Sequence, residues 1–135
     1  MQTRQSGADA SIRAKRLARL VARAVGATMP SVKGKLQNSN LCIYKRQPAG
    51  IKTAMFRKGV RFHVYLSLLK KTVHTIFAHE MKKNVFQIYL MKSSAVRKVG
   101  MRALHRRHQK VAIQITLDQV AHSGTRVCEK RIKIR

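Results

Sequence analysis

Acid–base catalysis is the first chemistry that this sequence could support, because Glu80 directly follows His79 and a carboxylate can orient a histidine base. Only three other acids, Asp9, Asp118 and Glu129, occur among the 135 residues. They lie far apart along the chain, so a pair of catalytic carboxylates would depend on the fold to bring two of them together. We therefore predict no catalytic residues and no enzymatic activity.

Metal binding is the second chemistry, and its ligands are equally scattered. The zincin motif H-E-x-x-H would need a histidine three residues after Glu80, and the sequence has none there. His105 and His108 have a metal-ligand spacing, but their cationic neighbours repel a divalent ion. Cys42 and Cys128 match no metal-ligand spacing, and the P-loop, G-x-G-x-x-G and G-x-S-x-G motifs are absent. We predict no metal, no cofactor and no small-molecule substrate.

Basic residues carry the positive signal. Thirty Lys and Arg against four acids give a formal net charge of +26, of which residues 1–67 and residues 68–135 each contribute +13. The charge therefore belongs to the body of the protein rather than to a basic tail. Because like charges repel in a compact chain, we expect a partner with dense negative charge, and a phosphate backbone is the usual one.

The predicted phosphate contacts are Lys and Arg side chains that cluster along the whole chain. Arg offers a bidentate fork to phosphate, whereas Lys acts as a mobile point charge. The predicted nucleic-acid-binding residues are Arg13, Lys15, Arg16, Arg19, Arg23, Lys33, Lys35, Lys45, Arg46, Arg57, Lys58, Arg61, Lys70, Lys71, Lys98, Arg102, Arg106, Arg107, Lys110, Lys130, Arg131 and Lys133.

A few aromatic residues beside these clusters are candidates to stack on unpaired bases. Tyr44, Phe56 and Phe62 each adjoin a Lys or Arg. Phe62 also lies in an alternating strand pattern, which favours a core position for it. Since the chain has only seven aromatic residues and no RNP1-like run, the sequence does not predict a sequence-reading RNA module.

The elements that position these residues are predicted from hydrophobic periodicity. Helical patterns cover 11–27, 69–83 and 95–108, with Ser11 and then Ser93 or Ser94 as N-caps. Strand patterns cover 41–44, 60–68, 84–90, 111–117 and 126–135, and residues 47–50 have the composition of a turn. This order predicts an α+β fold, namely a small basic domain with an N-terminal basic helix, short strands and one or two further helices.

The length suits a single domain. We predict a mobile arm over 1–10 and a single nucleic-acid-binding domain over 11–135, in which 30–59 is a weakly structured connecting segment. The small core would be marginal against the charge repulsion. We therefore expect a bound polyanion to complete the fold.

The compartment is predicted from what the chain lacks and from its first helix. No apolar run approaches the length of a membrane span, so we predict no membrane partner. Two distant cysteines favour a reducing compartment. Residues 11–27 are Arg-rich, acid-free and amphipathic, which fits either a basic helix of the mature protein or a mitochondrial transit segment. We predict an intracellular protein of the cytoplasmic or mitochondrial ribosome.

These features predict a structural constituent of a large ribonucleoprotein, a ribosomal protein that binds rRNA through phosphate contacts and lies beside other proteins of the same particle. The alternative is a nuclear DNA-packaging protein. Residues 1–6 (MQTRQS) are similar to the tail of a core histone, and residues 93–96 (SSAV) are similar to a string in that family's long helix. The resemblance implies an all-helical fold, whereas the alternating patterns at 60–68 and 111–117 favour strands.

Overall fold

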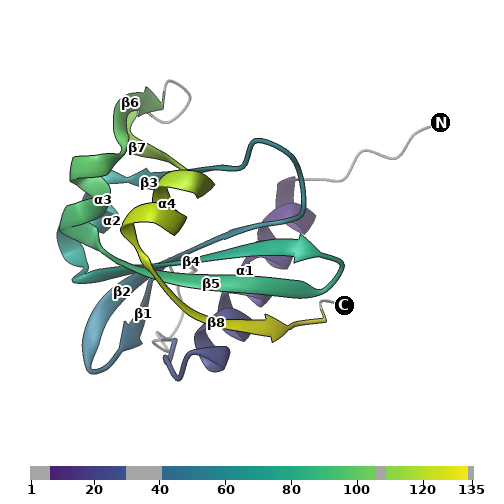
Figure 1. The fold of residues 1–135 in the computed structure, drawn as a ribbon. Coiled ribbons are helices and arrows are strands. Elements are labelled where there is room, and N and C mark those ends of the chain that lie inside the picture. Colours follow the sequence, from purple (N-terminus) through teal and green to yellow (C-terminus); the bar gives the residue numbers. More distant parts are fainter. Residues whose placement is uncertain (1–6, 30–40, 106–108, 134–135) are drawn as a thin grey trace.

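The computed structural model describes residues 7–29, 41–105 and 109–133, which form four helices and eight strands in two sheets (Figure 1). The helices are α1 (Gly7–Ala24), α2 (Leu66–Lys71), α3 (Ser93–Val99) and α4 (Leu117–Ser123). The strands are β1 (Leu41–Tyr44), β2 (Gln47–Ala54), β3 (Arg61–Tyr65), β4 (His74–Lys82), β5 (Val85–Lys92), β6 (Met101–His105), β7 (Lys110–Thr116) and β8 (Thr125–Arg131). The protein is thus a mixed α and β structure, as the sequence predicts.

The two sheets are joined by short helices. The larger sheet has the strand order β1-β2-β4-β5-β8, in which only the β2–β4 pair is parallel, and the smaller sheet has the antiparallel order β3-β7-β6. Within the described residues, α2 leads from β3 to β4, α3 from β5 to β6, and α4 from β7 to β8. Each of these helices therefore carries the chain from one sheet to the other.

The larger sheet lies between two hydrophobic cores. On one face, Leu17 and Val21 of α1 pack with Ile76 of β4. On the other face, Phe77 of β4 packs with Phe62 of the smaller sheet, at a ring-centroid distance of 4.8 Å. Because successive residues of a strand point to opposite faces, β4 is buried on both sides.

This double burial explains why the predicted helix over 69–83 is wrong. Only Leu69–Lys71 of that range are helical, as the end of α2, and the chain is extended from His74 onwards. The run Ile76, Phe77, Ala78 is continuously apolar because each residue faces one core or the other. Such a strand shows no period-2 pattern and resembles a buried helix in sequence.

The predicted helix over 95–108 is also wrong in its extent. The helix α3 ends at Val99, and the strand β6 begins at Met101. At Gly100 between them, an added Cβ would overlap Ile113 Cγ2 and lie 2.8 Å from the carbonyl oxygen of Gln114. The absence of a side chain at Gly100 is therefore what allows the chain to press against β7 and enter the smaller sheet.

The segment 30–59 contains more regular structure than predicted, because β1 and β2 form a hairpin within it. The turn is at Lys45–Arg46 and not at the predicted 47–50, where Gln47 already begins β2. Lys45 and Arg46 have φ values of 49° and 67°, the left-handed conformation that a tight hairpin turn requires and that Gly or Asn adopt more easily. Residues 30–40 lie outside the described part of the chain.

The remaining element predictions divide into confirmed strands and one missed helix. The strands predicted at 84–90 and 111–117 are confirmed by β5 and β7, while the strand predicted at 60–68 ends at Tyr65, where α2 begins. The strand predicted at 126–135 is β8, which ends at Arg131. Nothing predicted α4, which is held by a capping box between Thr116 and Gln119. The eight described strands do not fit the all-helical fold that the histone resemblance implies.

Candidate nucleic-acid interface

A basic groove lies where α2, α3 and β6 meet. Its charged lining is Lys70 from the last turn of α2, Arg97 and Lys98 from the last turn of α3, and Arg102 from β6. All four side chains are exposed. The groove encloses about 430 Å³ and is completed by Leu66, Ser94 and Ile113. We call it the α2–α3 groove.

The structure explains why these four cations gather there. The two helices pack together, since Leu68 and Leu69 of α2 and Val96 of α3 are buried in the same core. A buried hydroxyl network ties their ends, because Ser93 Oγ lies 2.7 Å from Thr72 Oγ1 and 2.9 Å from Thr75 Oγ1. The network therefore joins the C-terminal end of α2 to the first residue of α3, and the packing of the two helices brings Lys70, Arg97 and Lys98 to one groove. Cations at a helix C-terminus are also favoured by the helix dipole.

A second basic surface is the outer face of the smaller sheet. Phe62 and Val64 of β3 point into the core, so Arg61 and His63, which alternate with them, are exposed on the opposite face. On the same face Lys110 of β7 places its Nζ 5.1 Å from the centroid of the Tyr65 ring. This face combines cations with an aromatic ring, as surfaces that bind single-stranded nucleic acid do.

The β1–β2 hairpin presents a third group of cations at its tip. Lys45 and Arg46 are both exposed there, and Lys45 Nζ lies 5.4 Å from the centroid of the Tyr44 ring. Their left-handed backbone costs on the order of 1 kcal/mol each, a strain that Gly or Asn would avoid. Tyr44 itself is buried in the core between α1 and the larger sheet, so it does not stack on bases as the sequence suggested.

The other predicted contact residues lie on separate surfaces. On α1, Arg16, Arg19 and Arg23 are exposed opposite the buried face, Lys15 is half-buried, and Arg13 lies in the same helix. Arg57 and Lys58 are exposed in the loop before β3, Lys71 ends α2, and Lys130, Arg131 and Lys133 are exposed in and after β8. Lys33, Lys35, Arg106 and Arg107 lie outside the described residues.

His79 and Glu80 do not form the acid–base pair that their adjacency suggests. They are consecutive residues of β4 and point to opposite faces of the sheet. Glu80 is buried, and its carboxylate accepts hydrogen bonds from the backbone N–H of Phe56 at 2.9 Å and of Asn84 at 2.9 Å. Its contacts are therefore those of a residue that fixes the loop before β3.

Two residues outside the predicted contacts emerge from the structure. Arg97 lines the α2–α3 groove, and its spacing from Lys70 could be read only from the packing of the two helices. His79 lines a separate pocket with Arg57 and Arg61, although the three are far apart in sequence or on different elements. For Arg97 the usable signal was its place beside Lys98 in a basic cluster. His79 was noted in the sequence only as a neighbour of Glu80, and that adjacency does not indicate the pocket.

The cysteines and the candidate metal ligands offer little chemistry within the described chain. Burial raises the pKa of the Cys42 thiol to about 11, so the thiol stays protonated at neutral pH and is a poor nucleophile. Cys128 is free and half-buried. Among the described residues, no three His, Cys, Asp or Glu side chains come together as metal ligands.

The sequence matches no protein-family model and no curated protein. Function must therefore be inferred from the surfaces themselves.

None of the helices in the described part is long and apolar enough to cross a membrane.

Acidification is expected to destabilise the protein through His74 and His79. Burial lowers the pKa of both side chains below the ordinary value of 6.5, with Lys92 and Lys45 adding to the effect at His74 and Glu80 opposing it at His79. Above pH 6.5 both histidines are neutral in the folded and unfolded states, so they do not reduce the free energy of unfolding. Below it the unfolded chain takes up protons first, so stability is lost as the pH falls through the folded-state pKa values.

The measurement is the melting temperature between pH 7.5 and pH 5, where we expect a fall on the order of a few °C. Replacing both residues, His74→Gln and His79→Gln, should flatten this dependence. The matched control is His122→Gln, which removes the same ring from an exposed position on α4. A profile that stays as steep without His74 and His79 would assign the effect to other groups.

Proposed function

We propose that this protein is a structural nucleic-acid-binding protein of a large ribonucleoprotein, and that it binds rRNA in a ribosome. The observation that carries the proposal is the α2–α3 groove, in which Lys70, Arg97, Lys98 and Arg102 converge from three elements on a chain of net charge +26. Among the described residues, no carboxylate lines this groove. Four cations without a counter-charge form a site for backbone phosphates.

RNA is preferred to DNA because the cations lie on several differently oriented surfaces. The groove, the outer face of the smaller sheet, the hairpin tip and the exposed side of α1 each carry two or more exposed Lys or Arg. A regular duplex presents its phosphates along one path, whereas a folded RNA surrounds a protein on several sides. The binding mode is phosphate contact and shape fitting, without base reading by the groove.

Neutralising the groove should weaken RNA binding and reduce its salt dependence. The test variant carries Lys70→Ala, Arg97→Ala, Lys98→Ala and Arg102→Ala. Because each substitution removes one cation from a phosphate, the slope of log K against log salt should fall by about 0.7–0.9 for each, and the affinity at physiological salt by about 10- to 100-fold. The measurement is fluorescence anisotropy of an rRNA fragment over a salt series.

The control variant removes the same charge elsewhere, through Lys82→Ala, Lys83→Ala, Lys92→Ala and Arg126→Ala, all of which are exposed and outside the groove. Its slope should change by less than half as much. Equal effects in the two variants would show that only net charge matters. Co-sedimentation of the natural protein with ribosomal subunits tests the particle, and association with chromatin instead would refute the ribosomal assignment.

A further inference from the structure

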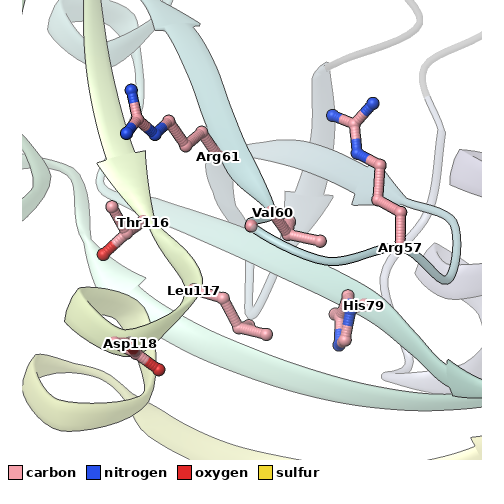
Figure 2. Close-up of a pocket in the computed structure, with 8 residues that line it drawn as sticks. Arg57, Val60, Arg61, His79, Thr116, Leu117 and Asp118 are labelled. Atoms are coloured by element: carbon pink, nitrogen blue, oxygen red, sulfur yellow. The ribbon is translucent and has the colours of Figure 1, made fainter.

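A second pocket lies at the junction of the two sheets and differs in character from the α2–α3 groove. It encloses about 280 Å³ between the loop before β3, the strand β4 and the start of α4 (Figure 2). Its lining residues are Arg57, Gly59, Val60, Arg61, His79, Thr116, Leu117 and Asp118. We call it the His79 pocket.

The polar groups of the His79 pocket are arranged asymmetrically. Figure 2 shows Arg57 and Arg61 to either side of Val60, with their guanidinium groups pointing away from Leu117 and His79, and Asp118 on the opposite side of Leu117. Val60 and Leu117 supply apolar surface between them, and His79 lines the same pocket. The pocket therefore has a cationic rim, an apolar centre and an acidic rim.

His79 contributes a polar atom that lacks a partner. Its Nε2 is buried and makes no hydrogen bond to any described residue. Because burial lowers the pKa of His79, the ring is neutral at pH 7, and its ring nitrogens can donate one hydrogen bond and accept another. An unsatisfied buried nitrogen of this kind is costly unless a ligand or water meets it.

The pocket walls are fixed by hydrogen bonds before any ligand arrives. The Phe56 N–H donates to Glu80, so the loop carrying Arg57 is tied to the strand that carries His79. The Leu117 N–H donates to the Val60 carbonyl at 3.2 Å. On α4, Thr116 and Gln119 close a reciprocal capping box, with distances of 2.9 and 3.1 Å, and this orients Leu117 and Asp118. Such a site spends little binding energy on ordering itself.

We propose that the His79 pocket binds one unstacked nucleotide of the RNA, with its base against Val60 and Leu117 and its flanking phosphates on Arg57 and Arg61. The proposal rests on the proposed function in RNA binding. Asp118 repels phosphate and accepts a hydrogen bond from an amino or imino group of the base, so the two rims fix the direction of the nucleotide. His79 supplies part of the pocket lining beside these residues.

The size of the pocket and its surroundings fit this ligand. Sites for drug-sized molecules begin at about 300 Å³, so a cavity slightly smaller suits a single base rather than a stacked pair. Extruding a base from a helix costs least where it is already unpaired, which selects a bulge or loop. Phe56, with 66% of its surface exposed directly before Arg57, offers a ring on which a neighbouring base can stack.

The test compares two RNA hairpins that are identical except for one unpaired purine bulged from the stem of the first. The full chain should bind the bulged hairpin about tenfold more tightly than the unbulged one, by fluorescence anisotropy at fixed salt. Arg57→Ala and His79→Gln should each reduce that preference to less than threefold. Lys58→Ala is the matched control, because it removes a charge from the same loop outside the pocket, and it should weaken both hairpins equally.

A second readout follows the base directly. With 2-aminopurine as the bulged purine, binding should change its fluorescence for the natural protein and for Lys58→Ala but not for Arg57→Ala. Since Arg57 is exposed, its replacement leaves the fold intact. Tight, equal binding of both hairpins without a fluorescence change would overturn the pocket proposal and leave the proposed function standing. Failure to bind either hairpin would refute the proposed function itself.

Discussion

The variant Phe77→Ala should not fold in the absence of a polyanion. Phe77 has no exposed surface, lies on a central strand of the larger sheet and contacts Phe62 across the gap between the sheets. Truncating such a ring leaves a cavity and costs about 3–5 kcal/mol. Whole domains are stabilised by only about 5–15 kcal/mol, and here repulsion among the cations already opposes folding. The measurement is chemical denaturation followed by circular dichroism.

The matched control for this prediction is Phe56→Ala. It removes the same ring from a position where the ring is mostly exposed, so the free energy of unfolding should change by no more than about 0.5 kcal/mol. If both variants were destabilised equally, Phe77 would not be the link between the sheets that the structure indicates. Adding RNA to Phe77→Ala should restore part of its structure, because a ligand of the folded state shifts the equilibrium by mass action.

The second large effect is stabilisation of the natural protein by polyanions. A net charge of +26 on 135 residues places many cations within one Debye length of each other, roughly 8 Å at physiological ionic strength. We expect the protein to be partly unfolded at low salt. RNA at 100 times its dissociation constant should add about 2.7 kcal/mol of stability, which corresponds to a rise in melting temperature of about 10 °C.

Sodium chloride at matched ionic strength separates screening from binding. Screening alone should give a smaller rise than RNA or sulfate, because chloride does not bridge neighbouring cations. A neutral polymer at the same mass concentration should have almost no effect, since crowding contributes at most about 1 kcal/mol. A sharp melt at low salt that RNA leaves unchanged would contradict the idea that the partner completes the fold.

The strand β7, in which polar and apolar residues alternate, could be predicted from the sequence, whereas the strand β4 could not. The alternation at 111–117 located β7, because polar and apolar residues mark its two sides. In β4 both sides meet a core, so Ile76 and Phe77 carry no such mark. The short helices α2 and α4 span fewer than two full turns, and no helical period develops over so few residues.

The basic character of the interface was evident in the sequence, but its geometry was not. Lys70 and Arg97 meet only because α2 and α3 pack against one core, which no local pattern encodes. In the sequence, the adjacency of His79 and Glu80 suggested an acid–base pair. In the structure the two side chains point to opposite faces of β4, because successive residues of a strand alternate in direction. The pocket that His79 lines could not be predicted either, because its residues come from three segments that are distant in the sequence, namely 57–61, His79 and 116–118.

The passage of the chain between the sheets has a consequence for how fast this protein folds. The strand β3 pairs only with β7 in the smaller sheet, and the strands β4, β5 and β6 lie between these two in the sequence. The hydrogen bonds of β3 therefore form only when this long intervening segment has closed into a loop. Pairings so distant in sequence incur their loop entropy before their hydrogen bonds form, and they fold slowly. During that interval the apolar side of β3 stays open to other chains. The abundant Lys and Arg then slow aggregation, because partly folded chains of high positive charge repel one another until a polyanion binds.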